Sequence, residues 1–186
     1  DSGSADASER NVQARQRGEY KSPGPRTLAN SVTQTWSWPC VLVFVSEWRG
    51  DVLYGRNEAV DGHYVLAYAD EPTRADEVHR RPPERMLLWH CNYHPDGGQL
   101  FWPLDGKPFV VPAALPGDDL QPESFKAFWS DGSVGIYIHP GIWHEGVFPV
   151  NETGRYFDKQ GKVHARVSCD LAREFGVLLN VPLPQG

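Results

Sequence analysis

Turn-forming residues recur along this chain so often that few stretches are long enough for a helix. The 186 residues include 18 glycines and 16 prolines, which separate short apolar runs such as 36–48, 63–69 and 85–94. Short apolar runs bounded by turn residues are typical of β-strands. We therefore expect an all-β fold, an antiparallel sandwich or closed barrel, with few short helices: a helical turn near residues 121–125 and a short helix within residues 163–181.

The polar character of the first 30 residues sets them apart from the remainder of the chain. They contain no long apolar face, so we expect a flexible N-terminal arm over residues 1–30 and one β-barrel domain over residues 31–186. Residues 71–85 are charged and interrupted by proline, which predicts a surface loop.

Charge and hydropathy exclude several classes of protein. The formal net charge is −6, and no basic stripe suits a nucleic acid or an anionic membrane surface. No run of about 18 apolar residues predicts a membrane-spanning helix. The three cysteines form no CxxC pair, which favours reduced thiols and an intracellular, cytoplasmic location. Because the chain begins with Asp1, a removed targeting segment remains an open alternative.

Two stretches carry specific expectations about strand pairing. In "GGQLFWPLDGKPFVVPAAL" the Asp105–Gly106 dipeptide predicts a hairpin between the strands on either side. The run over residues 36–48 is apolar on both faces. A sheet edge of that kind is normally covered, so we expect a homodimer.

Histidines are concentrated in two short segments. His90 and His94 lie four residues apart on an expected strand and share a face if the strand is regular. Gln99 follows a turn, and in "GIYIHPGIWHEGV" His139 and His144 flank a Pro-Gly corner. Imidazoles beside a glutamine on the inner wall of a barrel suit a divalent transition metal. The alternative for each is a hydrogen-bonded packing histidine, which we expect for His63, His79 and His164.

Other polar and aromatic residues are weaker candidates. Asp170 interrupts the apolar "VSCDLA", where a carboxylate is costly unless it is paired or functional. Glu145 follows His144 directly, so an extended backbone would turn it toward solvent. Trp102 and Trp143 either line a pocket or pack in the core.

The run from His94 to Val147 resembles the ureidoglycolate lyase family. The matching features are "HPDGGQ", the "FVV" strand, "GDD" before "KAF", and Gly135 followed by His139 and "WH" at 143–144. The resemblance implies a cupin-like antiparallel β-barrel of the jelly-roll type, usually dimeric. It also implies an enzyme of purine and allantoin degradation that splits ureidoglycolate into glyoxylate and urea, with nickel or another divalent metal as cofactor.

The sequence departs from the family at three positions. Asp105 stands where the family usually has lysine, Lys107 where it has glutamate, and Glu145 where it has a second histidine. These departures keep two alternatives open. One is another cupin enzyme, a metal-dependent isomerase or dioxygenase acting on a small acid. The other is a non-catalytic barrel that binds a small acid.

The expected site residues fall into three groups. The catalytic candidates are His144, with His139 or Asp170 as the proton shuttle. The metal ligands would be His94, Gln99 and His144. A small hydroxy or ureido acid would be contacted by Gln99, Trp102, Trp143 and Lys107, although surface turn chemistry is the alternative for Lys107.

Overall fold

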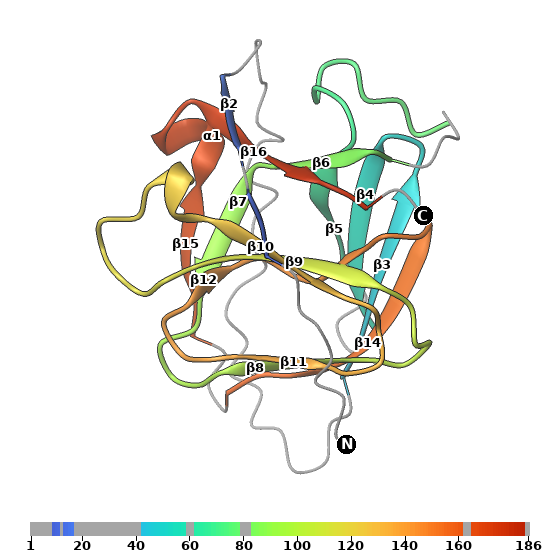
Figure 1. Cartoon of the computed structure of the whole chain (residues 1–186), viewed down its shortest axis with the longest axis vertical. Helices are drawn as coiled ribbons and strands as arrows, with labels where there is room; N and C mark the ends of the chain where they lie inside the picture. The colour runs from blue at the N-terminus through green and yellow to red at the C-terminus, as the bar shows by residue number, and fades with distance from the viewer. Residues whose placement is uncertain are drawn as a thin grey trace.

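The computed structural model describes residues 9–11, 13–16, 42–58, 62–78, 83–161 and 165–184. Within these ranges the helical elements are a 3-10 turn, η1 (Pro122–Ser124), and the short helix α1 (Leu171–Glu174). The described remainder consists of strands and their connections (Figure 1). The expectation of an all-β fold with few short helices is therefore confirmed, because η1 lies near residues 121–125 and α1 lies in the C-terminal segment.

The first of two antiparallel sheets has seven strands. Its spatial order is β1 (Glu9–Asn11), β10 (Lys126–Ser130), β9 (Phe109–Ala114), β12 (Trp143–His144), β7 (His90–Tyr93) and β15 (Val167–Asp170), and β13 (Phe148–Pro149) also pairs with β9.

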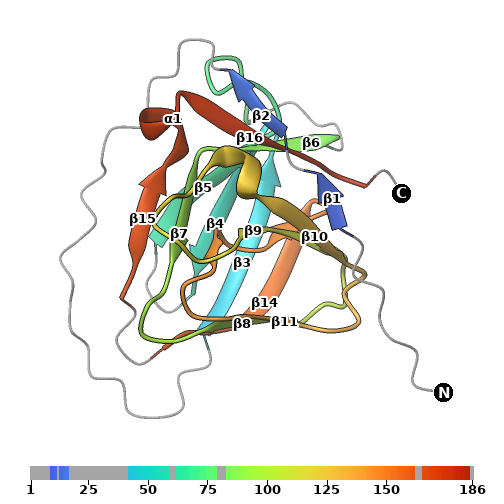
Figure 2. The same ribbon diagram turned by 60° about the vertical axis from the view of Figure 1, so that its left-hand side comes forward.

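The second sheet has nine strands and curls around the first (Figure 2). Its order is β11 (Ile136–Ile138), β8 (Gln99–Pro103), β14 (Thr153–Lys159), β3 (Leu42–Arg49), β4 (Val52–Asn57), β5 (Gly62–Tyr68), β6 (Arg85–Leu88), β16 (Val177–Pro182) and β2 (Gln13–Gln16). Two strongly curled antiparallel sheets of this kind are the expected cupin-like β-barrel architecture.

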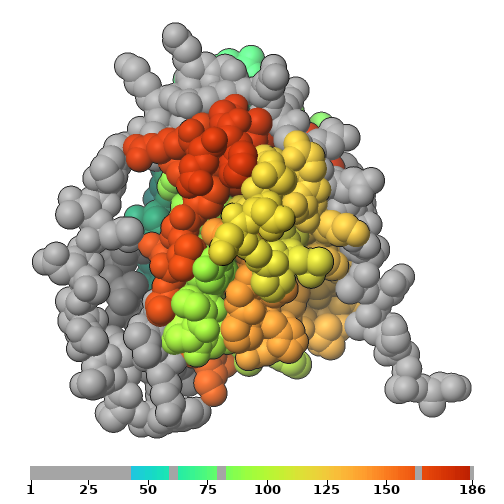
Figure 3. All heavy atoms as spheres, turned by 90° about the vertical axis from the view of Figure 1, so that its left-hand side faces the viewer, coloured from blue at the N-terminus to red at the C-terminus, as the bar shows by residue number. Residues whose placement is uncertain are grey.

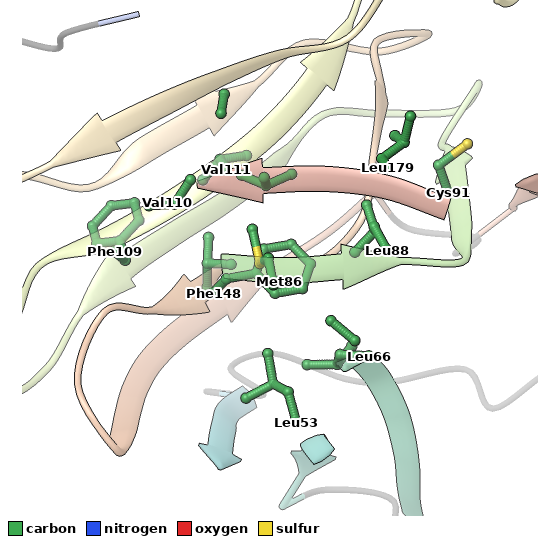
Figure 4. Close-up of a cluster of buried hydrophobic side chains, with 14 of the residues drawn as sticks. Leu53, Leu66, Met86, Leu88, Cys91, Phe109, Val110, Val111, Phe148 and Leu179 are labelled. Carbon is green, nitrogen blue, oxygen red and sulfur yellow. The ribbon is translucent and has the colours of Figure 1, made fainter. Parts of the chain in front are cut away.

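The hydrophobic core joins the two sheets. Figure 4 shows Phe109 of β9 and Phe148 of β13, from the seven-stranded sheet, in one cluster with Leu53, Leu66 and Met86 of the nine-stranded sheet. Each of these side chains is at most 2% exposed. Burial of one such side chain stabilises the fold by about 1.5–3 kcal/mol. The core therefore fixes the distance between the sheets and with it the positions of the polar side chains described below.

The predicted hairpin at Asp105–Gly106 is wrong. Gly106 does have the left-handed backbone conformation of a tight turn, with φ of 63°. However, β8 pairs with β11 and β14, whereas β9 pairs with β10, β12 and β13. The turn reverses the chain between two sheets instead of joining neighbouring strands. Turn residues specify the local reversal, but the partner of each strand depends on the whole barrel.

The expectation that residues 36–48 form a sheet edge is also wrong where it can be examined. Residues 42–49 form β3, which lies between β14 and β4 inside the nine-stranded sheet. Because β3 is paired on both sides, its apolar residues do not mark an exposed sheet edge. Residues 36–41 lie outside the described residues, as do Cys40, His79 and His164.

The N-terminal residues that are described belong to strands. β1 pairs with β10 and β2 pairs with β16. The expected boundary near residue 30 lies outside the described residues. Residues 71–78 form turns and bends with mostly exposed side chains, in agreement with the predicted loop. Among the described residues no helix is long and apolar enough to cross a membrane.

A two-residue turn at Gly50–Asp51 joins β3 to β4 and anchors the 71–78 loop. The Asp51 N–H donates to the Asp76 carbonyl at 2.7 Å. Gly50 has a φ of 57°, and a Cβ atom there would lie 2.0 Å from the Asp76 carbonyl oxygen and 2.5 Å from the Glu77 carbonyl carbon. Glycine is therefore required both by the backbone conformation and by the close approach of another backbone segment.

We expect Gly50→Ala to destabilise the protein more than Gly106→Ala, by about 1–3 kcal/mol of additional overpacking. Both glycines have a positive φ, so alanine costs about 1–2 kcal/mol of backbone strain at either. Only at Gly50 does the new methyl group collide with backbone, because nothing lies within 4 Å at Gly106. Urea denaturation of the two variants measures the difference. Equal losses would contradict the described contact between the turn and the loop.

Candidate active site

One face of β7 carries three polar side chains. His90 and Asn92 alternate along the strand with Cys91 and Tyr93, and His94 directly follows its last residue, so the three share a face, as expected for the two histidines. His144 of β12 is the registered partner of Asn92 and shares that face. Figure 3 shows this segment, in green, between the red C-terminal segment and the yellow and orange segment that includes β10 to β12.

The Pro140–Gly141 corner is tied to β7 through the backbone. The Gly141 N–H donates to the His94 carbonyl at 3.1 Å, and the Ile142 N–H donates to the His139 carbonyl at 3.3 Å. Gly141 has a φ of 80°, which glycine adopts without strain. The corner therefore delivers His144 beside His94, and their ring centroids lie 5.4 Å apart.

Both of these imidazoles converge on a single amide oxygen. Gln99, the first residue of β8, places its Oε1 atom 3.1 Å from His94 Nε2 and 2.9 Å from His144 Nε2. The three side chains are buried, with 5% exposure for Gln99, 6% for His94 and 2% for His144. The structure thus brings together the three residues predicted as metal ligands.

Hydrogen bonds at the other ring nitrogens determine what these atoms can do. The Nδ1–H of His94 donates to the Ala165 carbonyl at 2.8 Å, and the Nδ1–H of His144 donates to the Ile142 carbonyl at 2.7 Å. A neutral imidazole carries one N–H, so each Nε2 then presents a lone pair. Two ring nitrogens and one amide oxygen therefore face each other as acceptors.

A fourth residue, Asp158 of β14, completes the cluster. Its Oδ1 atom accepts a 2.9 Å hydrogen bond from Gln99 Nε2, which directs the amide oxygen toward the histidines. Burial raises the pKa of Asp158 to about 6. Asp158 shares one face of β14 with Tyr156, which is fully buried. Sequence reasoning did not identify this residue.

The surroundings hold His144 in its neutral form. The pKa of His144 is lowered to about 4, chiefly by burial and also by the neighbouring His94, whereas the hydrogen bond to Ile142 and the charge of Glu145 oppose the shift. At neutral pH the His144 Nε2 lone pair is therefore available to a cation or to a ligand hydroxyl group.

A second polar cluster adjoins the first. The expectation that Glu145 points into solvent is wrong, because β12 ends at His144 and the next side chain turns inward. Glu145 Oε2 lies 2.5 Å from His90 Nδ1 and accepts from Asn92 Nδ2 at 3.5 Å. Burial alone would raise the pKa of Glu145, but His90 and then Arg166 and His144 leave it lowered. Glu145 is therefore a charged acceptor at neutral pH.

The proposed proton shuttles lie outside these contacts. His139 is exposed on the corner, where its ring packs edge-on against Tyr137 at 5.1 Å. Asp170 caps helix α1 by accepting from the Arg173 N–H at 3.0 Å. It also forms a 3.3 Å ion pair with that arginine side chain. These contacts explain Asp170 structurally, and a catalytic role for either residue stays a prediction.

The remaining substrate-binding candidates are dispersed. Trp102 follows the inward-facing Phe101 on β8 and is 48% exposed. Trp143 is buried, packs edge-on against Tyr93 at 4.7 Å and donates to the Gly117 carbonyl. Lys107 contacts Thr153 and pairs with Asp105 at 3.3 Å. The structure groups none of the three with Gln99, and their assigned role stays a prediction.

The donor set suits a divalent transition metal only if the amide takes part. Among the described residues no group of three or more His, Cys, Asp or Glu side chains could hold a metal ion. Two imidazole nitrogens and an amide oxygen are nevertheless ligand types that such ions accept. A cation between the three acceptor atoms would also offset the repulsion between their lone pairs. The alternative to a bound cation is a Gln99 amide rotated by 180°, so that its NH2 group donates to the histidines. Its oxygen would then face Asp158, which would have to be protonated to donate to it.

The two shifted pKa values act on stability in opposite directions. The lowered pKa of His144 means that the unfolded chain binds more protons between about pH 6.5 and 4, so stability falls as the pH falls through that range. The raised pKa of Asp158 means that the folded chain binds more protons between about pH 6 and 3.8, so stability rises as the pH falls.

We therefore expect Asp158→Asn to make the metal-free protein more acid-sensitive. Removal of the opposing carboxyl group should increase the stability lost between pH 7 and pH 4 by on the order of 3 kcal/mol. Urea denaturation at the two pH values, with a chelator present, measures this loss. The exposed Asp118→Asn serves as the control and should match the unmutated protein. If both variants respond alike, Asp158 does not have the raised pKa assigned to it.

Comparison with known proteins finds similarity in the part of the chain that carries this site. The ureidoglycolate lyase family model matches residues 83–172. Similar proteins include the ureidoglycolate lyase of Azotobacter vinelandii, 33% identical over 95 residues, which are 50% of this chain and 55% of the relative. The enzyme of the same name from Salmonella enteritidis is 34% identical over 103 residues, 53% of this chain and 64% of the relative.

A third relative gives the same result. The ureidoglycolate lyase of Pseudomonas savastanoi pv. phaseolicola is 37% identical over 90 residues, 47% of this chain and 51% of the relative. The chain thus spans about half to two thirds of the length of these curated relatives. The matched segment, residues 83–172, contains His94, Gln99, His144 and Asp158, and the match confirms the resemblance seen in the sequence.

Proposed function

We propose that this chain is a lyase that cleaves ureidoglycolate into glyoxylate and urea. The observation that carries the proposal is the convergence of His94 Nε2 and His144 Nε2 on Gln99 Oε1. These residues lie inside the segment that matches the ureidoglycolate lyase family. Buried groups with unsatisfied electron pairs are costly unless a ligand or a reaction uses them.

The proposed reaction needs a base, an acid and an anchor for a small acid. Ureidoglycolate is a hemiaminal, with a hydroxyl group and a urea nitrogen on the same carbon. Loss of the hydroxyl proton forms the aldehyde C=O bond as the carbon–nitrogen bond breaks. The departing nitrogen takes up a proton to give urea, so atoms and charges balance.

The described residues can divide these tasks. Gln99 fixes the separation of the His94 and His144 rings, which turn their Nε2 atoms toward the hydroxy-acid end of the substrate. Asp158 has a pKa of about 6, near the value at which a group exchanges protons most effectively at neutral pH. We therefore assign the proton exchange to Asp158 in preference to His139 or Asp170, which lie on the exposed corner and at the N-cap of α1.

A divalent metal, nickel by family resemblance, is part of the proposal. His94, His144 and Gln99 are the residues that would hold it. When bound, such an ion supplies positive charge that polarises the carboxylate and hydroxyl oxygens of a small acid.

We further propose a homodimer. The supporting observation is an exposed aromatic pair on the outer face of β8 and β11. Trp102 is 48% exposed and Tyr137 is 53% exposed. Tyr137 is registered with Leu100 and therefore shares the face of Trp102. Aromatic residues are enriched where protein interfaces form.

An intracellular, cytoplasmic location is proposed from the thiols. Cys91 and Cys169 are directly opposed on β7 and β15, yet both are free. An oxidising compartment favours disulfides between cysteines with such geometry.

We expect His144→Gln to lower turnover of ureidoglycolate by about 10²–10⁴-fold, the range for loss of an acid–base or ligand group. Glutamine keeps most of the volume and a polar end, so thermal stability should change less than in His144→Ala. The latter leaves a cavity at a residue that is 2% exposed. Release of urea and glyoxylate, bound metal and melting temperature are measured together.

His63→Gln is the matched control, because His63 is exposed on β5. Its turnover should equal that of the unmutated protein. Unchanged turnover in His144→Gln would overturn the assignment of the site. An unmutated chain that releases neither product would overturn the proposed substrate and favour a small-acid-binding barrel or a different cupin enzyme.

A further inference from the structure

Asn92 contains a buried hydrogen-bond acceptor with no donor. The residue is 6% exposed, and its Nδ2 group donates to Glu145 Oε2 at 3.5 Å. Its Oδ1 atom is buried and has no hydrogen-bond partner. A buried polar atom left without a partner costs about 1–3 kcal/mol, so its persistence points to a missing partner.

Glu145 supplies a second open acceptor next to Asn92. Its Oε2 atom is engaged by His90 and Asn92, and within the described part of the chain Oε1 has no hydrogen-bond partner. The side chains of Glu145 and His90 are 13% and 17% exposed. The pair therefore lies where the buried cluster meets solvent.

Two acceptors side by side select a ligand group rich in N–H donors. A carboxylate, an aldehyde or an ether would bring further lone pairs toward Asn92 Oδ1 and Glu145 Oε1. The terminal NH2 group of a ureido acid brings two hydrogens on one nitrogen, which can be divided between the two oxygens. Sites of this kind reject an analogue that lacks the donor, because their own buried groups are then unpaired.

We propose that Asn92 and Glu145 form the subsite for the terminal NH2 of the ureido group, beside the His94–Gln99–His144 cluster. This inference rests on the proposed function for the identity of the ligand. It assigns the two clusters to opposite ends of one molecule. Asn92 and Glu145 hold the urea end, and the two imidazoles with Gln99 face the hydroxy-acid end. Glu145 thereby gains a role at a position where the family usually has histidine.

The test uses a matched pair of ligands that the protein cannot cleave. N-Carbamoylglycine is ureidoglycolate without its hydroxyl group, and N-acetylglycine replaces its terminal NH2 with a methyl group of similar size. We expect the unmutated full chain to bind N-carbamoylglycine at least about 10-fold more tightly, because only that ligand satisfies the two acceptors. Isothermal titration calorimetry measures both dissociation constants.

Two variants test whether Asn92 and Glu145 cause the preference for N-carbamoylglycine. Asn92→Leu removes the orphaned oxygen while keeping the branching and the number of heavy atoms, and should reduce the ratio of the two dissociation constants to about 1–3, by loss of that acceptor. In Glu145→Gln the amide oxygen is held by His90, so the NH2 group faces the ligand and should also reduce the ratio. Asn180→Leu is the control, since Asn180 on β16 has an orphaned Oδ1 of its own. It should keep the full ratio.

Each outcome bears on the subsite separately from the lyase activity. A ratio near 1 in the unmutated protein, binding of neither ligand, or a ratio preserved in both Asn92→Leu and Glu145→Gln would overturn the subsite. If Asn92→Leu does not fold, the ligand pair with Glu145→Gln decides the question. A high ratio without turnover of ureidoglycolate leaves the subsite standing and removes the lyase. Turnover of ureidoglycolate with a ratio near 1 supports the lyase and overturns the subsite.

Discussion

The hydrogen bonds from His94 Nδ1 to Ala165 and from His144 Nδ1 to Ile142 determine the chemistry of this barrel. Because each carbonyl can only accept, a neutral ring at either position carries its hydrogen on Nδ1 and turns an unprotonated Nε2 toward Gln99. The backbone therefore imposes the tautomer. Asp158 completes the arrangement by holding the amide nitrogen of Gln99, so that a third acceptor faces the two rings. The candidate site depends on this concentration of lone pairs inside a buried cluster.

The fold delivers these groups from segments distant in sequence. His94 directly follows β7, and the Pro-Gly corner, bonded through Gly141 to the His94 carbonyl, leads into β12, which supplies His144. Gln99 and Asp158 come from β8 and β14 of the other sheet. The apolar cluster that joins the sheets holds these four side chains at hydrogen-bonding distance. Rigid strands and a core of close-packed side chains are the means by which a small barrel can position a site to within a fraction of an ångström.

The sequence could predict what depends on local periodicity. Two-residue alternation placed His90 and His94 on one face, and glycine at 106 did mark a left-handed turn. It could not predict pairing across the barrel, so the strands flanking Asp105–Gly106 were assigned to one hairpin although they belong to different sheets. Glu145 was misplaced because strand β12 ends one residue earlier. Asp158 was missed because a lone aspartate in a strand has no distinctive spacing, and its pKa is shifted by burial that only the folded chain creates.

The most direct test of this account is the protonation state of the two rings. Nitrogen-15 NMR of the labelled, metal-free protein at about pH 8 distinguishes protonated from unprotonated ring nitrogens of neutral histidines. The account predicts that His94 and His144 both carry hydrogen on Nδ1 and that both Nε2 atoms are unprotonated. A hydrogen on Nε2 of either ring would mean that it donates to Gln99 in an ordinary hydrogen bond. The lone pairs would then be satisfied internally, and the cluster would be a packing arrangement instead of a site.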